Sequence, residues 1–411
     1  MSANPPWREG DKIFLIAGEP SGDALGARLI AALRRATGDR FQFVGVGGER
    51  MEAEGFSSLF PLTDIAVMGL TEVLPRLPLL LRRIDDTAAA VWRAGPAAVV
   101  TIDAPSFGLR VADRVRRSGV PLIHYVAPQL WAWRPGRARS LARRVDQLLA
   151  LLPFEPEFFG KLGVPCTYVG HPVLEDALLP ASGDEFRIRH GIAASAPVVI
   201  AMPGSRIGLV QRMWSVFRAA LDHLAARVAG LHVVLPAVAG TEAFLREATA
   251  GWALPHTLLS TADERRSAFA AAAAALTVSG TATMELAVAG VPMVVAYRVS
   301  AITEFLARRM IAVPHVAMPN LILGRAAVPE LLQADCTPER LAAELAGLID
   351  GGSAAQRRDL AEICRRLGLD DIRAGGPKPS DRAAAVILDA VRERRVRAAE
   401  PRAPEPGARA R

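Results

Sequence analysis

Two turns in the second half of the chain combine the residue types that bind phosphate. Gly204-Ser205-Arg206 follows an apolar run at 197–202, and Ser279-Gly280-Thr281-Ala282-Thr283 follows another at 275–278. A glycine turn between strand and helix presents free amides and the positive end of a helix dipole, and Arg206 can bind phosphate oxygens as a fork. Glu285, in the first turn of the second helix, can reach sugar hydroxyls. Together the turns predict a nucleotide diphosphate site, although ordinary helix capping explains either turn alone.

Carboxylates end two apolar runs in the first half of the chain. Asp103 follows the run 97–102, where apolar neighbours can bring its pKa near that of a general base; the alternative is an N-cap for the next helix. Glu19 and Asp23 belong to the turn Gly18-Glu19-Pro20-Ser21-Gly22-Asp23 after the run 12–17. They can hold substrate hydroxyls or amines, or merely face solvent beside a helix capped by Ser21.

Other polar or glycine-rich positions carry weaker signals. His124 and His171 lie near predicted strand ends, and a structural role is the better interpretation for His171. Gly47, in a GxGG turn, is expected to let backbone approach a ligand or a helix. The sequence contains no metal-ligand spacing, P-loop or Gly-x-Ser-x-Gly turn.

Short apolar runs alternate with helical patterns throughout the chain, which predicts two doubly wound α/β domains that face a cleft. The polar segment 178–196 is expected to cross between the domains. The predicted boundaries are 1–177, 178–390 with last helices that can pack back on the first domain, and a disordered tail at 391–411 rich in Arg, Ala and Pro. The predicted strands are 12–17, 41–46, 97–102, 121–126, 147–152, 164–169, 197–202, 231–235, 256–259, 275–278 and 291–297.

The segment from Ile65 to Arg83 is strongly apolar, is broken by Pro75 and Pro78, and has arginines at its edges. It fits either a buried helix pair or a surface that rests on anionic lipid or admits an acyl chain. The prolines argue against a transmembrane helix.

Composition narrows the class of protein. The net charge of +7 favours anionic partners, and three cysteines in 411 residues fit a reducing cytosol. The N-terminal residues lack a signal-peptide pattern, and no apolar run reaches the ~20 residues of a membrane span. We expect a cytosolic protein that can touch a membrane surface. The sequence leaves open whether copies form a homo-oligomer.

The order of segments resembles the lipid-A-disaccharide synthases. The resemblance rests on IAGEPSGDALGARLI, VGVGGERMEAEG, VMGLTEVL, IDAPSFGLRVA, HYVAPQLWAWRPGRA, LLPFEPEFF, YVGHPV, MPGSR, SGTATMELAVAGVPMVVAYR, VAMPNLILGR and VPELLQ. It runs from Ile13 to about Leu345, and HYVAPQLWAWRPGRA is its most diagnostic piece.

The resemblance implies a two-domain inverting glycosyltransferase of the GT-B type that needs no metal or other cofactor. Its substrates would be UDP-2,3-diacylglucosamine and 2,3-diacylglucosamine 1-phosphate (lipid X), used at the cytoplasmic face of the inner membrane. The products would be a β-1,6 disaccharide 1-phosphate and UDP.

Carried onto this sequence, the resemblance makes Asp103 the candidate base, with Glu19 and Asp23 as alternatives. The expected UDP-side residues are Ser205, Arg206, Ser279, Gly280, Thr281, Thr283, Glu285 and Asn320. The expected acceptor-side residues are Ser21, Gly22, Gly47, His124 and Trp133. One position departs from the family: Leu209 stands where a Glu usually follows the arginine.

Two other functions compete with this interpretation. A transferase or epimerase of the same architecture could act on a soluble UDP-sugar, although such an enzyme would not need the apolar segment 65–81. A non-catalytic nucleotide-sugar or nucleic-acid binder could use the basic charge. The acids Glu19, Asp23 and Asp103 argue against nucleic acid, because they would repel its phosphates.

Overall fold

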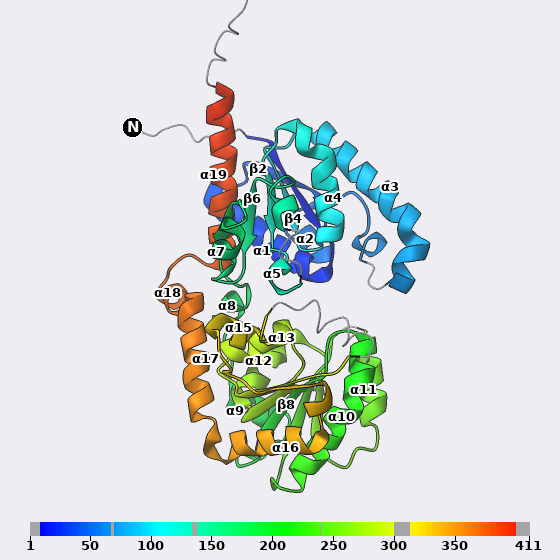
Figure 1. Ribbon diagram of the computed structural model, residues 1–411, viewed down its shortest axis with the longest axis vertical. Helices are drawn as coiled ribbons and strands as arrows, with labels where there is room; N and C mark the ends of the chain where they lie inside the picture. The colour runs from blue at the N-terminus through cyan, green and yellow to red at the C-terminus, as the bar shows by residue number, and fades with distance from the viewer. Residues whose placement is uncertain (1–8, 67–69, 134–137, 239, 300–312, 400–411) are drawn as a thin grey trace, which may run out of the picture. The chain divides into compact units, whose positions relative to one another are not determined.

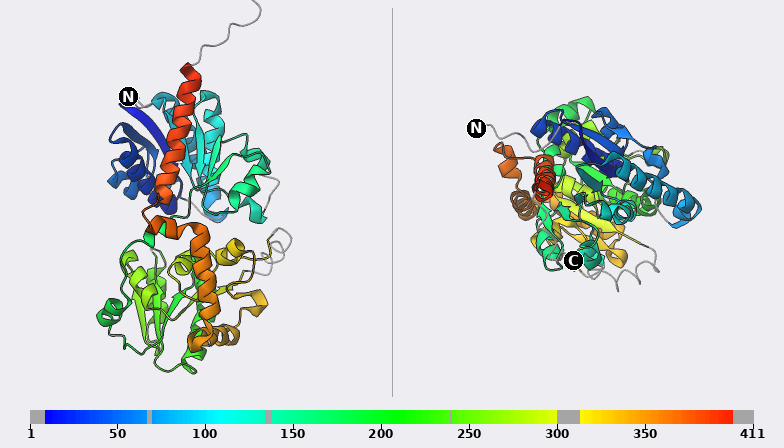
Figure 2. Two further views of the ribbon diagram at one scale, coloured as in Figure 1. Left: turned by 90° about the vertical axis from the view of Figure 1, so that its left-hand side faces the viewer. Right: turned by 90° about the horizontal axis from the view of Figure 1, so that it is seen from above.

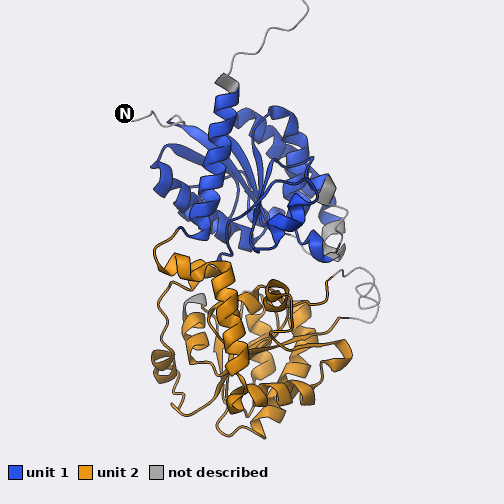
Figure 3. Ribbon diagram, turned by 60° about the vertical axis from the view of Figure 1, so that its left-hand side comes forward, with its two compact units in different colours: residues 1–172, 377–411 blue, residues 173–376 orange. Residues whose placement is uncertain are grey.

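The computed structural model describes residues 9–66, 70–133, 138–238, 240–299 and 313–399 (Figure 1). The chain forms two compact units, which Figure 3 shows in separate colours. The first unit holds residues 1–172 and 377–411, and the second holds residues 173–376. Each unit is built on one sheet and is described separately.

The first unit contains a seven-stranded parallel sheet in the order β3-β2-β1-β4-β5-β6-β7. Its strands are β1 Asp11–Ala17, β2 Phe41–Val46, β3 Ser57–Ser58, β4 Ala98–Ile102, β5 Leu122–Tyr125, β6 Gln147–Ala150 and β7 Cys166–Tyr168. Its helices are α1 Pro20–Thr37, α2 Glu49–Ala53, α3 Leu70–Ala94, α4 Pro105–Val115, α5 Leu130–Trp133, α6 Ala138–Leu141, α7 Glu155–Gly160 and α19 Pro379–Ala399, with 3₁₀ turns at Leu62–Asp64 and Arg116–Ser118.

Both faces of this sheet are covered, as parallel strands require. Alternate residues of β1 enter opposite cores: Ile13 and Leu15 pack with α1 and α19, whereas Phe14 and Ile16 pack with α3 and α4. This two-sided burial explains why the strands read as continuous apolar runs instead of an alternating pattern.

The second unit contains a six-stranded parallel sheet in the order β10-β9-β8-β11-β12-β13. Its strands are β8 Val198–Met202, β9 His232–Pro236, β10 His256–Leu259, β11 Ala274–Thr277, β12 Met293–Tyr297 and β13 Glu330–Leu332. Its helices are α8 Val173–Asp176, α9 Gly183–Arg189, α10 Ile207–Ala225, α11 Glu242–Thr249, α12 Ala262–Ala271, α13 Thr281–Val288, α15 Met318–Leu323, α16 Pro338–Gly347, α17 Ala354–Leu367 and α18 Leu369–Arg373, with a 3₁₀ turn at Gln333–Asp335 and a π turn at Leu348–Gly352.

The predicted fold class, two doubly wound α/β domains, is confirmed, and each sheet reverses its strand order once. The reversal lies between β1 and β4 in the first unit and between β8 and β11 in the second. Open α/β sheets bind ligands outside the carboxyl ends of strands at this switch point. Strands β3 and β13, which are two and three residues long, were not predicted from the sequence.

The predictions for the segment 178–196 and for the C-terminal tail were wrong. The segment 178–196 does not merely cross between domains, because its helix α9 buries Phe186 completely in the second unit and Arg187 donates to Ala271 O at 2.9 Å. The tail is not disordered from Val391, because α19 continues to Ala399 and packs on α1 (Figure 2). An ion pair between Arg395 and Asp11 holds the last turns of α19.

Among its described residues, the apolar segment 65–83 forms a single helix from Leu70 onward and not a helix pair. Helix α3 runs through Pro75 and Pro78, which lie on its exposed side near its start. Water can therefore replace the helical hydrogen bonds that the prolines remove. Within the described part of the chain, no helix has the length and apolarity that crossing a bilayer requires.

Candidate active site

Asp103 lies at the switch point of the first unit, directly after β4. The hydroxyl of Ser21, at the start of α1, donates to Asp103 Oδ2 at 3.2 Å, and the amide of Ala104 donates to Oδ1 at 2.9 Å. The Asp103 side chain is partly exposed. Ala104, and not Asp103, occupies the N-cap of α4, so the structure favours the interpretation of Asp103 as an available carboxylate over that of a helix cap.

The backbone at this edge is strained. Asp103, Ala104 and Val126 have φ of 52°, 41° and 77°, values that residues with a Cβ rarely adopt. Such strain persists only where the surrounding structure holds it, and it concentrates at functional sites. Gly18 helps to hold it, because a Cβ at position 18 would lie 2.3 Å from the Ala104 Cβ. The two turns that carry Ser21 and Asp103 are therefore pressed together.

Asp23 has a structural role, which corrects its prediction as a catalytic acid. It is buried, and its oxygens accept the amides of Gly48, Arg50 and Met51 at 2.8–3.1 Å. These amides belong to the start of α2, so Asp23 caps that helix from a distance along the chain. Glu19 stands at the N-cap position of α1 and is partly exposed, and it keeps its place among the candidates.

Two glycines expected on the acceptor side serve helix packing. A Cβ on Gly22 would lie 3.1 Å from Ile102 O, and one on Gly47 would lie 2.7 Å from the Met51 sulfur. Both residues are buried. The alternative that Gly47 admits a neighbouring helix is therefore the correct one, and neither glycine presents a surface to an acceptor.

His124 does not line the edge of the sheet, contrary to our prediction. It is fully buried, its Nδ1 lies 2.6 Å from Thr101 Oγ1, and its Nε2 has no partner among the described residues. Burial lowers the pKa of His124 to about 4. His171 is also buried, and burial together with Arg28 lowers its pKa to about 4. The side chain of Trp133 lies outside the described residues.

Arg206 and Ser205 lie at the switch point of the second unit, after β8. Both side chains are exposed, and Arg206 is the N-cap residue of α10. The preceding Gly204 has φ of 135°, and a Cβ there would lie 2.9 Å from the Leu209 side chain. Leu209, the departure from the family pattern, thus packs over the turn. An apolar contact therefore supports the turn at the position where the resemblance led us to expect a carboxylate.

The second phosphate-type turn lies beside the first, because β11 neighbours β8 and Val278 N donates to Met202 O at 3.1 Å. It ends in Gly280, which has φ of 148°, and leads into α13. Thr281 is exposed and Ser279 partly exposed, with Ser279 Oγ donating to Val316 O at 2.6 Å. The first amides of α13 point out of the helix start, as in any helix.

Thr283 stabilises this turn from the protein interior, contrary to its prediction as a phosphate ligand. Its side chain is fully buried, and its hydroxyl donates to Gly280 O at 2.7 Å. Glu285 is partly exposed and pairs with Arg265 of α12, whose Nη1 lies 3.2 Å from Glu285 Oε2. The candidate ribose ligand therefore has its orientation set by an arginine from the adjacent helix.

Asn320 is a structural residue and does not line the edge of the sheet. It is fully buried; its Nδ2 donates to Val328 O at 2.9 Å and to Glu330 Oε1 at 2.6 Å. Its Oδ1 accepts the amides of Ala327 and Val328 at 2.7 and 2.8 Å. Glu330 also accepts the amide of Ala317 at 3.0 Å. This network holds the loop between α15 and β13.

Three residues near these edges were missed by sequence reasoning: Glu155, Arg265 and Glu330. Glu155 is 2% exposed, and burial raises its pKa to about 7 against three hydrogen bonds that lower it. The signal available was an acid flanked by Phe154 and Pro156 just after an apolar strand. Arg265 and Glu330 have no comparable local signal, because their partners lie in other elements.

Comparisons with known proteins identify the family to which the chain is similar. The family described as lipid-A-disaccharide synthetase matches residues 13–372. The lipid-A-disaccharide synthase of Rhodospirillum centenum is 51% identical over 93% of this chain and 95% of its own length. That of Gluconobacter oxydans is 45% identical over 94% of this chain and 92% of its own length.

Solved structures share the fold at low identity. A UDP-GlcNAc 2-epimerase from Neisseria meningitidis, bound to UDP-GlcNAc, has a TM-score of 0.62 at 11% identity and covers 93% of this chain and 100% of its own. The glycotransferase of kitacinnamycin has a TM-score of 0.60 at 17% identity, covering 93% and 99%. These structures show that the chain has the GT-B architecture of two Rossmann-like units. The family match and the curated relatives show that the chain belongs to the lipid-A-disaccharide synthase family, whose members are glycosyltransferases.

Proposed function

We propose that the protein transfers 2,3-diacylglucosamine from its UDP donor to the 6-hydroxyl of lipid X, with inversion, to give the β-1,6 disaccharide 1-phosphate and UDP. Family membership supports the reaction type. The observation that carries the proposal is Asp103, a partly exposed carboxylate at a switch point, oriented by Ser21 on a strained backbone.

The chemistry divides between the two units. The acceptor hydroxyl oxygen bonds to the anomeric carbon of the donor while the bond from that carbon to the UDP oxygen breaks. Asp103 takes the hydroxyl proton, and inversion requires the base on the face opposite UDP. Arg206, Ser205, Ser279, Thr281 and the first amides of α13 would stabilise the charge that develops on the departing diphosphate. Glu285 would bind the ribose hydroxyls.

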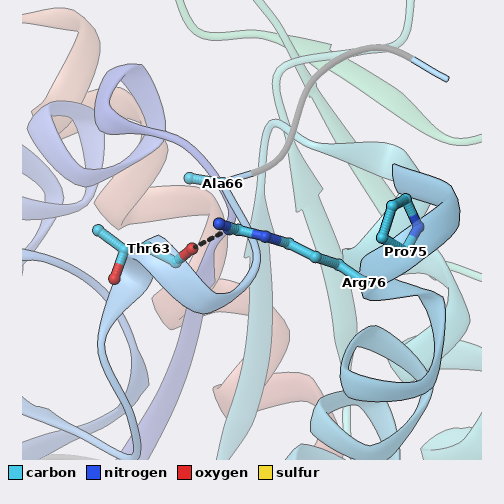
Figure 4. A pocket seen from close by; sticks show the side chains of 4 residues that line it. All are labelled: Thr63, Ala66, Pro75 and Arg76. Carbon is cyan, nitrogen blue, oxygen red and sulfur yellow. Dashed lines mark hydrogen bonds between the residues drawn. The ribbon is translucent and has the colours of Figure 1, made fainter. Parts of the chain in front are cut away.

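Helix α3 supports peripheral binding to the cytoplasmic face of the inner membrane. Leu77 and Leu81, one turn apart, are 38% and 41% exposed, and Arg82 lies beside them. A pocket of about 580 Å³ opens nearby between Thr63, Ala66, Pro75 and Arg76 (Figure 4). Arg76 spans it and donates to Thr63 O at 3.4 Å. Exposed leucines beside arginines suit an anionic lipid surface.

The direct test measures UDP release from UDP-2,3-diacylglucosamine with and without lipid X, in the presence of EDTA. We expect release that depends on lipid X and resists EDTA. Binding of UDP without release in the presence of both lipids would contradict the proposal. UDP release that depends on a soluble sugar acceptor instead of lipid X would favour the alternative transferase.

Replacement of the base tests its assignment. Asp103→Asn should lower kcat by about 10²–10⁴-fold, the usual contribution of a general base, and leave UDP affinity unchanged. Glu19→Gln, across the same switch point, is the matched variant. If Asp103→Asn kept full turnover while Glu19→Gln lost it, Glu19 would be the base.

A further inference from the structure

Glu155, the first residue of α7, is a buried carboxylate with three donors around it. Trp131 Nε1 donates to Oε1 at 3.1 Å, and the amides of Leu151 and Leu152 donate to Oε2 at 3.0 and 2.9 Å. Every one of these partners is a donor, so the arrangement suits the ionised carboxylate. Trp131 also meets Phe154 edge to face, with ring centroids 5.1 Å apart.

These bonds join two segments that leave neighbouring strands. Trp131 belongs to α5, in the segment that follows β5, whereas Leu151 and Leu152 follow β6. Glu155 therefore attaches the segment after β5 to the end of β6. The strand before the attached segment, β5, lies next to β4, and Asp103 directly follows β4.

The strand that leads into the attached segment touches the backbone of Asp103, because Tyr125 is the last residue of β5. Asp103 N donates to Tyr125 O at 2.9 Å, and Val126 N donates to Leu149 O at 3.1 Å. Val126 has φ of 77°, which is a strained conformation for a β-branched residue. Such strain persists only where surrounding contacts hold it, and the Trp131–Glu155 bond is one contact that holds the segment starting at Val126.

We propose that Glu155 is a positioning residue for sugar transfer: through Trp131 it holds residues 126–133, which directly follow the β5 residue bonded to Asp103, and its ionised form holds them better than its protonated form. This inference rests on the proposed function and adds a residue to it. Because Glu155 is buried, the proposed role is exerted through Trp131 and not by direct contact with a substrate.

Two titratable side chains near Glu155, those of Cys166 and Tyr168, keep their charge state at the pH where Glu155 titrates. Burial, followed by the charge of Glu155, raises the pKa of Cys166 on β7 to about 12. Burial is also the main reason that the pKa of Tyr168 rises to about 12, with Arg382 of α19 acting in the opposite direction. Both groups stay neutral where Glu155, with a pKa of about 7, titrates. Protonation turns a charge-assisted bond to Trp131 into a neutral one about half as strong.

Trp131→Phe is the test variant, because it keeps an aromatic ring against Phe154 and removes the indole N–H; the smaller ring also loses buried volume, which the control variant below loses as well. We expect kcat/KM to fall by about tenfold at about pH 8.5, the value of one charge-assisted hydrogen bond. At about pH 5.5, where wild-type Glu155 is protonated, the deficit should shrink to about threefold.

Trp252→Phe is the matched control. Trp252 is 7% exposed, as is Trp131, and its Nε1 donates to the Asp222 carboxylate at 2.7 Å, but it lies in the second unit. Any deficit it shows should be the same at both pH values. A Trp131→Phe deficit that is absent, or that does not change with pH, would overturn the inference.

Hydrogen exchange gives a readout that does not depend on activity. Amides of residues 122–133 should exchange faster in Trp131→Phe and in Glu155→Gln than in wild type at one pH, while those of the second unit should not change. If wild type transferred no sugar but this difference appeared, the proposed function would fail and Glu155 would be a structural anchor only. If transfer proceeded and exchange were equal, the inference alone would fail.

Discussion

At the scale of single residues, identical side chains acquire different roles from their neighbours. Asp23 and Asp103 both follow apolar strands, yet backbone amides occupy both oxygens of Asp23. Asp103 keeps a partly exposed carboxylate held by one hydroxyl and one amide. A base must meet a proton of the substrate, so of these two aspartates only Asp103 has the accessibility that the role demands.

Arg206→Ala should weaken UDP binding by about 10–100-fold, because an exposed guanidinium at the start of α10 would lose its charge-assisted bonds to phosphate. Calorimetric titration with UDP measures this. Arg212→Ala provides the control, since Arg212 is exposed on the same helix but further from its start. Equal affinities for the Arg206→Ala and wild-type proteins would remove Arg206 from the phosphate site.

Asn320→Ala should lower the free energy of unfolding by about 2–4 kcal/mol, because it leaves the buried amides of Ala327 and Val328 without acceptors. Urea unfolding measures the change. Thr281→Ala, at an exposed hydroxyl in the same unit, should alter stability little. A stable Asn320→Ala protein with weakened UDP binding would restore Asn320 as a ligand.

At the scale of elements, the proposed phosphate site depends on two helix starts, and the proposed membrane contact depends on one face of a helix. Helix α13 begins at Thr281, directly after Gly280, and its strand β11 neighbours β8, which leads to α10. The buried hydroxyl of Thr283 closes the turn before α13. Helix α3 exposes leucines on one side and buries Ile84 and Val91 on the other. One element can thus complete a core and still present an apolar surface.

The double variant Leu77→Ser, Leu81→Ser should reduce co-sedimentation with anionic vesicles by about tenfold or more, since each leucine contributes about 1–2 kcal/mol when it leaves water. UDP affinity should not change. Ile188→Ser is the control, because Ile188 is 82% exposed on α9 without a second exposed large apolar side chain on that helix. If the double variant sedimented with vesicles as well as wild type does, residues other than Leu77 and Leu81 would be responsible for membrane binding.

At the scale of the whole molecule, buried titratable groups of the first unit link folding to pH. Burial lowers the pKa of His124 and His171 from 6.5 to about 4, so the unfolded chain binds more protons in that interval and stability falls as pH drops through it. Each histidine lowers the free energy of unfolding by about 3 kcal/mol as the pH falls from about 6.5 to about 4. Glu155, raised from 4.5 to about 7, acts in the opposite direction and offsets one of the two.

We therefore expect urea midpoints to decrease between about pH 6.5 and pH 4.5, with the slope of roughly one net proton. His124→Gln should remove most of this slope, because the remaining histidine and Glu155 then nearly cancel. Circular dichroism at each pH measures the midpoints. Midpoints that rise as the solution is acidified would mean that the histidines are charged in the folded protein.

The sequence by itself determined the two doubly wound domains, most strands to within two residues, and the turns that carry Ser21, Asp103, Arg206 and Ser279. These features depend on local patterns, namely two-sided apolar strands and glycine turns before helices, which neighbouring residues encode. The family resemblance was equally local, since it rests on short motifs in a fixed order.

Only the tertiary structure decided which polar side chains remain available. Asp23, His124, Thr283 and Asn320 resemble site residues in sequence, but elements distant along the chain bury them or occupy their hydrogen-bonding atoms. Glu155 shows the reverse, because its importance arises from Trp131, 24 positions earlier. Desolvation and hydrogen-bond satisfaction are set by neighbours in space, and spacing along the chain does not encode them.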